Sequence, residues 1–192
     1  MVPPRNRFWR STKGIFILGK NMSITIRTAT QDEVDAIRRM HAACWLDTYP
    51  NDEHGVPYAW VKSVTDEWLS PEKLELSKQH FTNVFNSRDH FYRVAVDNSK
   101  IAGFVHGLKE DGKTKLGALY LAKEYYGTGL AQQLAALADE WLGDDAVELE
   151  VVAYNKRAIR FYEKWGFKKV EGSDALFKDK IPDFTMRREA KV

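Results

Sequence analysis

The sequence predicts a single α/β domain with a mixed, largely antiparallel central sheet flanked by helices. Residues 91–121 contain three apolar segments joined by two short polar turns, a pattern typical of antiparallel strands. Residues 116–166 then alternate strand, helix, strand and helix, which indicates a mixed sheet covered by helices. The length of 192 residues, with 44% hydrophobic and 29% charged residues, is that of one globular domain.

Residues 1–21 differ in charge from the rest of the chain. They contain 5 basic residues and no acidic one, and without them 24 basic (29 minus 5) and 27 acidic residues are left. Met22 is followed at once by an alternating strand, Ser23 to Arg27. We therefore expect residues 1–21 to be a disordered or non-native leader, Met22 to be the biological start, and residues 22–192 to be the domain. The alternative is a genuine basic arm used for targeting or association.

Helices are predicted between the first strand and the three sheet strands. Thr30 and Glu33 form a capping-box pattern, and the helix that it begins runs to about Leu46. Further helices are expected over residues 61–69 and 73–85, the second of them preceded by a Ser-Pro start signal.

Two patterns in this helical region bear on chemistry. His41 and Cys44 are residue types that can form a nucleophile pair. They continue a helical stripe begun by Val34 and Ile37, so we interpret them as core residues. The loop of residues 47–58 places acidic side chains beside aromatic ones. That composition suits a cationic amine, through charge pairing and cation–π contact, and it suits a solvated surface loop equally well.

A tight glycine turn follows the third sheet strand. Gly127 and Gly129 flank Thr128. The helix behind them carries an apolar stripe made of Leu130, Leu134, Leu137 and Trp141. Glycines let the backbone approach a ligand closely, and a helix N-terminus offers unpaired N–H groups and the positive end of its dipole. The turn therefore predicts an anion site, best suited to phosphate or pyrophosphate.

A second helix signal follows a β-branched strand at residues 147–152. Asn155 is a favourable N-cap, Gly166 suits the position after the last helical residue, and Phe167 supplies the usual hydrophobic contact beyond it. The helix between them carries Ala158, Phe161, Tyr162 and Trp165. A last strand is predicted at residues 184–187.

These segments resemble the acetyl-CoA-binding core of the GNAT family of N-acetyltransferases. The family pattern Q/R-x-x-G-x-G/A is matched at Gly129 and Ala131, while Tyr126 replaces the usual Gln or Arg. Downstream, L-x-V-x-x-x-N-x-x-A-x-x-F-Y-x-x-x-G-F is matched from Leu149 to Phe167. The resemblance extends, more weakly, over residues 23–188 and implies the family's fold for the whole domain.

The resemblance also implies the activity. An acetyl-CoA-dependent N-acetyltransferase is expected, in which a primary amine of a small molecule or peptide attacks the thioester directly. Tyr162 would be the catalytic residue, a general acid that protonates the leaving thiolate. The alternative is that Tyr162 is an aromatic residue of the packed helix face without a role in catalysis. The strand at 119–121 would hold the pantetheine arm, the glycine turn the pyrophosphate, and Asn155 would lie beside the arm. The implied cofactor-binding residues are Leu119, Tyr120, Leu121, Tyr126, Gly127, Thr128, Gly129, Leu130, Ala131, Asn155 and Tyr162.

The general base stays open at this point. Many members of the family place a Glu on or beside this strand, and residues 115–118 contain none. The candidates are His106, Glu150, Tyr120 or an ordered water. A second function also stays open, namely a catalytically weak, CoA-binding regulatory protein with the same fold, separable from the enzyme by acetyl-CoA binding without turnover.

Other classes are disfavoured by spacing and composition. The five histidines show no metal-ligand spacing, and neither a P-loop nor a dinucleotide fingerprint occurs. No apolar run has membrane-spanning length, and the domain lacks the basic bias of nucleic-acid binders. The single cysteine, Cys44, cannot form an internal disulfide, so a cytoplasmic location is expected. The expected partner is the amine substrate, without nucleic acid, membrane or metal, and a homodimer is one option for assembly.

Overall fold

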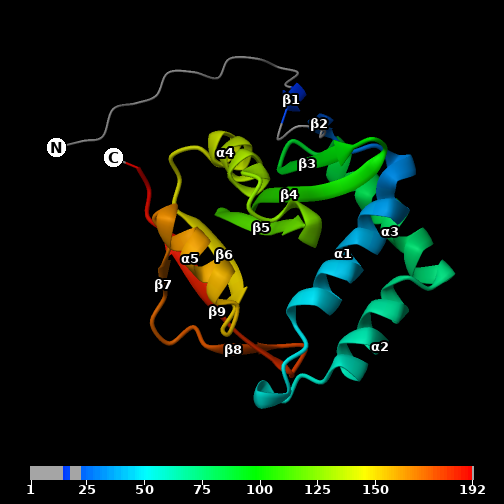
Figure 1. Ribbon diagram of the computed structural model, residues 1–192. Coiled ribbons are helices and arrows are strands. Elements are labelled where there is room, and N and C mark those ends of the chain that lie inside the picture. The colour runs from blue at the N-terminus through cyan, green and yellow to red at the C-terminus, as the bar shows by residue number, and fades with distance from the viewer. Residues whose placement is uncertain (1–14, 18–22, 192) are drawn as a thin grey trace.

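The computed structural model describes residues 15–17 and 23–191, which fold around one mixed sheet (Figure 1). Nine strands in the described ranges join it in the order β1-β2-β3-β4-β5-β6-β9-β7, with β8 paired to β9. Neighbouring strands are antiparallel except β5 and β6, which are parallel. The strands are β1 (Ile15–Ile17), β2 (Ser23–Thr28), β3 (His90–Asp97), β4 (Lys100–Glu110), β5 (Lys113–Leu121), β6 (Val147–Val152), β7 (Lys168–Lys169), β8 (Ala175–Phe177) and β9 (Ile181–Arg188). The predicted fold class is confirmed.

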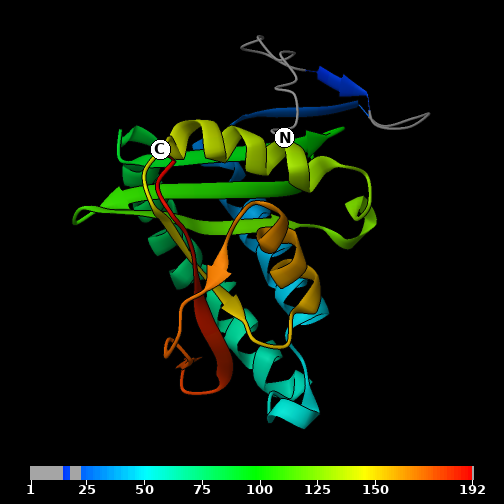
Figure 2. The same ribbon diagram turned by 90° about the vertical axis from the view of Figure 1, so that its left-hand side faces the viewer.

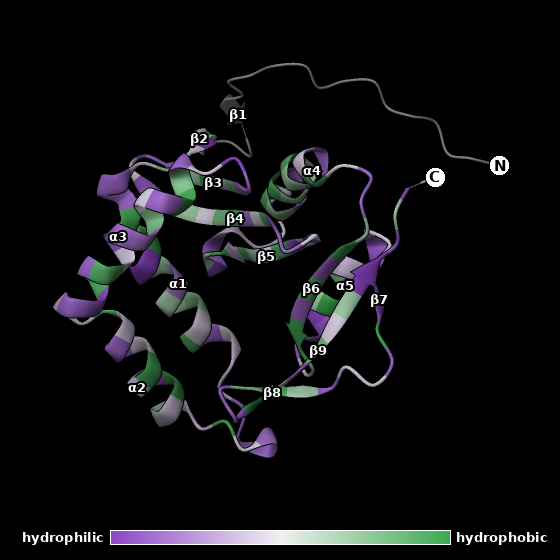
Figure 3. Ribbon diagram, turned by 180° about the vertical axis from the view of Figure 1, so that it is seen from behind, coloured by the Kyte–Doolittle hydropathy of each residue, from purple (hydrophilic) through white to green (hydrophobic). Residues whose placement is uncertain are grey.

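Helices cover both faces of the sheet (Figures 1 and 2). Three lie on one face, α1 (Val34–Thr48), α2 (Tyr58–Trp68) and α3 (Pro71–Asn86), and two on the other, α4 (Leu130–Leu142) and α5 (Lys156–Lys164). Hydrophobic and hydrophilic residues alternate along these helices, as expected for elements with one buried face (Figure 3). No helix in the described ranges has both the length and the apolar composition that a membrane crossing needs.

The core is divided by the sheet. The larger cluster lies between the sheet and α4, where Leu130 and Leu134 are fully buried. A second lies under α1 and α3, around Ile37 and Val94. A third joins the C-terminal end of α1 to α2 and to Ile181 at the start of β9. The apolar helix stripes predicted from the sequence therefore do face the core.

Most predicted elements are confirmed, with their ends shifted by a few residues. The 47–58 loop is more ordered than expected, because a 3-10 turn at Asp52–His54 and a bridge between Asn51 and Val56 organise it. α2 begins at Tyr58 rather than at residue 61, directly after Pro57. Strands β7 and β8 were not expected. They are 2 and 3 residues long, too short to show a periodic pattern.

The predicted leader is described only in part. Residues 1–14 and 18–22 lie outside the described residues, and so does the expected start at Met22. Ile15–Ile17 forms β1 and pairs antiparallel with β2, in the register Phe16 opposite Ile24. For these three residues an ordered strand replaces the expected disorder, and the rest of the leader remains a prediction.

β5 and β6 diverge soon after they pair. Their parallel register covers only Thr114 with Val147 and Lys115 with Glu148. Beyond it, β5 continues along β4 as far as Leu121, and β6 continues along β9. The segment 116–121 therefore keeps one unpaired edge that faces the gap between the two strands (Figure 1).

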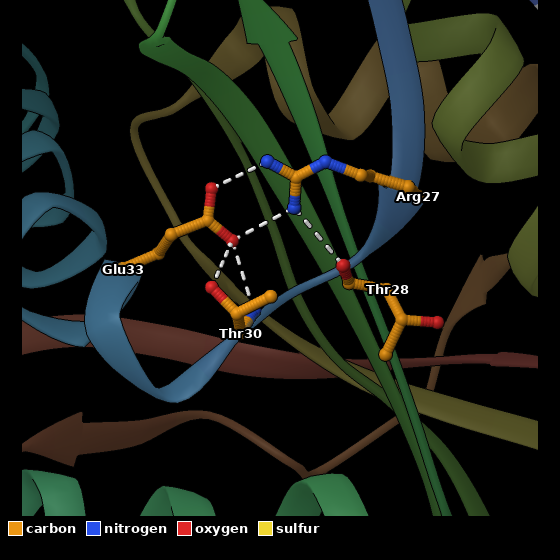
Figure 4. Close-up of polar contacts among 4 residues, drawn as sticks. All are labelled: Arg27, Thr28, Thr30 and Glu33. Carbon is orange, nitrogen blue, oxygen red and sulfur yellow. Dashed lines mark hydrogen bonds and ion pairs between the residues drawn. The ribbon is translucent and has the colours of Figure 1, made fainter.

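Glu33 ties β2 to the start of α1 (Figure 4). Its carboxylate accepts hydrogen bonds from the Thr30 amide, at 2.8 Å, and from both terminal nitrogens of Arg27, at 2.6 and 2.8 Å. The hydrogen bonds from Arg27 are the main reason that the pKa of Glu33 falls to about 2. The glutamate of the predicted capping box thus holds the helix start and an ion pair together.

Glu33→Gln should lower the free energy of unfolding by about 1 kcal/mol at pH 7. A carboxyl group whose pKa is lowered in the folded state stabilises the fold above its unfolded-state pKa, about 4.3 for Glu, and loses that effect as the pH falls toward the folded-state value. The loss should therefore be smaller at pH 3 than at pH 7, as measured by urea unfolding. Glu67→Gln removes only an exposed 4.0 Å contact with Lys73 and is the control. Equal losses for Glu33→Gln at the two pH values would contradict this account.

Candidate active site

A cavity of about 660 Å³ opens where β5 and β6 diverge. Its walls are the free edge of β5 at 116–121, residues 150–152 of β6, and the glycine turn with the start of α4. The N-terminal half of α5 and the inner faces of α1 and β9 close it. A cavity of this size, with apolar walls and a few convergent polar groups, is a binding site for a small organic ligand.

The glycine turn lies at one end of the cavity with its backbone exposed. Gly127 and Gly129 have φ angles of +75° and +87°, which glycine adopts without strain. A Cβ atom at either position would meet no atom within 4 Å, so the space in front of the turn is open. The amides of Gly127, Gly129, Ala131 and Gln132 donate to no described residue. The turn that is predicted to bind an anion therefore has an open approach and four amides without a partner among the described residues.

The other residues of the turn shape it from behind. The Thr128 hydroxyl donates to the Tyr125 carbonyl at 2.8 Å and accepts weakly from the Leu130 amide at 3.4 Å. Leu130 itself is fully buried and anchors α4 in the core. Tyr126 occupies the position where a Gln or Arg was expected. The guanidinium of Arg157 lies over its ring, with the guanidinium carbon 3.7 Å from the ring centroid.

α5 begins and ends as the sequence predicts. Asn155 caps it, since its Oδ1 accepts from the Ala158 amide at 3.1 Å. Gly166 has φ +85°, and the amide of Phe167 donates to the Tyr162 carbonyl at 3.1 Å, which is a Schellman ending. These two ends fix the helix so that Asn155 and Tyr162 both line the cavity.

Three tyrosines line the cavity, and the hydroxyls of two of them are hydrogen-bonded to each other. Tyr49 and Tyr120 share a hydrogen bond of 2.8 Å between their oxygens, and Tyr162 lies close enough for its ionisation to disfavour theirs. Burial raises the pKa of all three above the ordinary value, and repulsion between phenolates adds to the rise for Tyr49 and Tyr162. All three hydroxyls therefore keep their protons at neutral pH and are available as donors.

Comparisons with known proteins agree with this geometry. A model of the acetyltransferase (GNAT) family matches residues 35–167, more than half of the chain. The chain belongs to this family. A search of curated protein sequences finds no match at a significant level.

Solved structures of the GNAT fold cover most of the chain. The PaiA N-acetyltransferase of Thermoplasma acidophilum, in complex with coenzyme A, is 25% identical, with a TM-score of 0.66 over 88% of this chain and 99% of its own. A GNAT-family acetyltransferase from Streptococcus pneumoniae is 19% identical, with a TM-score of 0.67 over 88% and 100%. A ribosomal-protein alanine N-acetyltransferase from Escherichia coli is 19% identical, with a TM-score of 0.57 over 88% and 95%. As a GNAT member the chain is an N-acetyltransferase with acetyl-CoA as co-substrate.

Every cofactor-binding residue named from the sequence lines the cavity, except Thr128 and Leu130, which support the turn. Leu119, Tyr120 and Leu121 line it from the free edge of β5.

The candidate bases separate into two groups. His106 does not line the cavity; it lies toward α3, and its Nε2 is 2.9 Å from Nδ1 of His90. Burial, together with His90 and His80, lowers the pKa of His106 to about 4. Glu150 and Tyr120 do line the cavity. Asp183 of β9 lines it as well, and the sequence interpretation missed it because the strand was expected to begin at residue 184.

His41 and Cys44 are both in the cavity wall, yet they do not form a nucleophile pair. The Cys44 Sγ donates to the Leu121 carbonyl at 3.0 Å, and burial raises the pKa of its thiol to about 12. His41 Nε2 accepts from the indole N–H of Trp45 at 3.0 Å, and burial, with the nearby charge of Arg38, lowers its pKa to about 3. Both side chains are neutral packing groups, as the sequence interpretation has them.

The acidic loop is less involved than its composition suggested. Tyr49 lines the cavity, as does its neighbour Trp45 at the end of α1, but the acids Asp52 and Glu53 do not. The lining residues that sequence reasoning missed include Arg38, Trp68, Arg157, Phe177 and Asp183. Each comes from an element whose position depends on packing against distant parts of the chain.

Gly129→Ala tests whether the turn holds acetyl-CoA. The methyl group meets no clash, but the left-handed φ costs about 1–2 kcal/mol of stability. Gly112→Ala is the matched control, since Gly112 has φ +72° and open space in the turn between β4 and β5, outside the cavity. Both variants should lose similar stability, and only Gly129→Ala should lose about tenfold or more in acetyl-CoA affinity, as measured by titration calorimetry. Equal affinities of the two variants would place the phosphates elsewhere.

Proposed function

We propose that the protein transfers an acetyl group from acetyl-CoA to a primary amine of a small molecule or peptide, by direct attack of the amine on the thioester. The observation that carries this proposal is the single cavity between β5 and β6. It runs from the open glycine turn to the tyrosine hydroxyls and the carboxylates of Glu150 and Asp183. One space thus joins a phosphate cradle to groups that can handle protons.

The donor would be held mainly by backbone. The free edge of β5 around Leu119 to Leu121 offers strand-like hydrogen bonds to an extended pantetheine arm, and Asn155 lies across the gap from it. The unpaired amides of Gly127, Gly129, Ala131 and Gln132 and the N-terminus of α4 suit the pyrophosphate. The positive charge that position 126 lacks would come from Arg157, whose guanidinium stacks on Tyr126 beside the turn.

Acetyl-CoA supplies the activated acetyl group as a thioester. The protein's contribution is first to orient the acceptor amine, and well-oriented reactants can gain about 7 kcal/mol or more. Tyr162 Oη would hold a proton for the leaving sulfur, as proposed from the sequence. Its raised pKa keeps that proton in place at neutral pH. Because the thiol formed from the leaving thiolate has a pKa of only about 8.5, a hydrogen bond from Tyr162 to the sulfur is easier than complete transfer of the proton.

Asp183 is the base that the geometry favours. It lines the cavity from β9, and burial and the nearby charge of Glu150 raise its pKa above the ordinary aspartate value. A carboxylate with a raised pKa is a better proton acceptor. Glu150, which lies on the neighbouring strand and also faces the cavity, is the second carboxylate that could accept the amine proton, directly or through water.

The first experiment separates the enzyme from the alternative, a catalytically weak CoA-binding regulator. Acetyl-CoA binding is measured by titration calorimetry, and a panel of primary amines is then screened for release of the free thiol. The proposal requires both binding and amine-dependent release. Binding without release from any amine of the panel would favour the regulator.

Tyr162→Phe removes one oxygen and keeps the ring that packs against Phe167. Single-turnover acetylation should slow by roughly 100-fold, the lower end for general acid catalysis, because a thiolate is a good leaving group. Acetyl-CoA affinity and melting temperature should stay nearly unchanged. Tyr58→Phe, at an exposed site outside the cavity, is the control and should not slow the reaction. An unchanged rate in Tyr162→Phe would leave this tyrosine as a packing residue, and parallel losses of rate and affinity would make it a binding residue.

A further inference from the structure

Two arginines line the cavity without a carboxylate partner among the described residues, Arg157 beside the glycine turn and Arg38 on α1. Arg38 lines the cavity from α1, and among the described residues no carboxylate pairs with it. Its Nε is buried and has no hydrogen-bond partner. Burial lowers the pKa of this guanidinium, so the folded protein holds a charge that it does not fully solvate. A buried, unpaired charge costs free energy unless a ligand satisfies it.

A second donor without a partner lies beside it. The Tyr92 hydroxyl is buried, with 4% of the residue exposed, and has no hydrogen-bond partner. The positive charge of Arg38 acts on Tyr92 and opposes the rise that burial causes in its pKa. The internal contact that Arg38 does make is with the Trp68 ring, whose centroid lies 5.0 Å from the guanidinium carbon. That contact fixes the orientation of the group but leaves its N–H donors free.

Aromatic rings separate Arg38 from the reacting groups. The His41 ring, one helical turn further along α1, lies 4.3 Å from the Tyr120 ring and 5.5 Å from the Trp68 ring. Tyr120 in turn reaches the Tyr49 hydroxyl at 2.8 Å. His41 is neutral, because its pKa falls to about 3, so this stretch of wall carries no charge. It suits a flat, apolar part of a ligand.

Acidic groups line other walls of the cavity, on β6 and β9. Asp183 and Glu150 face the same cavity from β9 and β6, and neither comes from an element that carries Arg38. A ligand with a positive amine at one end and a negative group at the other would match both charges.

We propose that the acceptor is a primary amine that also carries a carboxylate, with a flat apolar body between the two, and that Arg38 binds the carboxylate. The guanidinium fork matches a carboxylate in a bidentate pair, which a point charge such as lysine does not. This inference rests on the proposed function, since it assigns the substrate class of the same site. Arg38 is a specificity residue in it and takes no part in acetyl transfer.

Two probes that differ by one group test the inference. The first is 4-(2-aminoethyl)benzoate and the second is 2-phenylethylamine, which lacks the carboxylate. Titration calorimetry with the full chain, saturated with coenzyme A, should show about tenfold or tighter binding of the carboxylate probe, as expected for hydrogen bonds to a charged group. Arg38→Met should bring the two affinities within about twofold of each other. Arg39→Met, which removes an exposed arginine from the next position of α1, should keep the preference.

Each outcome of this experiment either supports or overturns the inference. Equal affinities of the two probes for the unaltered protein, or no binding of either, would overturn the inference without any use of a variant. A preference that survives Arg38→Met would assign the carboxylate to another group and overturn it too. The thiol-release assay distinguishes failure of the proposed function from failure of this inference. If the carboxylate probe binds more tightly but no amine is acetylated, the inferred ligand class stands and the proposed acetyl transfer is wrong.

Discussion

The parting of β5 from β6 is the constraint on which the rest of the site depends. The two strands share only two paired positions, Thr114 with Val147 and Lys115 with Glu148, before each follows another neighbour. A sheet that stayed paired would satisfy its backbone groups and leave no room for a ligand. Because it parts, the edge at 116–121 stays open, the chain leaves β5 directly into the glycine turn, and α5 enters beside the gap.

The polar groups around the gap are held in defined protonation states by burial. The tyrosine hydroxyls keep their protons because burial raises their pKa, and His41 stays neutral because burial lowers its pKa. The charged side chains that line the cavity come from four elements, Arg38 from α1, Arg157 from α5, Glu150 from β6 and Asp183 from β9. A cavity lined by neutral donors and by side chains of both charges is suited to holding an amine against a thioester without an ionised nucleophile of the protein's own.

Sequence reasoning succeeded where the signal is local. The caps at Asn155 and Gly166 and the glycine turn follow from conformational preferences of single residues, and the resemblance to GNAT proteins rests on these same positions. The place of Arg38 in the cavity wall could not be predicted, because Arg38 lies outside the apolar stripe of its helix and its type is typical of the surface. Only the packing of α2 against α1 brings Trp68 next to it. Asp183 was hidden behind Pro182 at the start of β9, and Phe177 is carried by a strand of three residues. Side chains of this kind are placed by tertiary contacts, which no local pattern encodes.

Amide hydrogen exchange with and without saturating acetyl-CoA tests the central claim, that the open edge of β5 and the glycine turn form the donor site. The account predicts slower exchange at residues 116–121 and 127–132 when acetyl-CoA is bound, because amides without protein partners there gain hydrogen bonds. The strand pair β6–β9, already hydrogen-bonded along 147–152, should change little and serves as the internal reference. Binding of acetyl-CoA with slowed exchange elsewhere, and none along the β5 edge, would contradict the account.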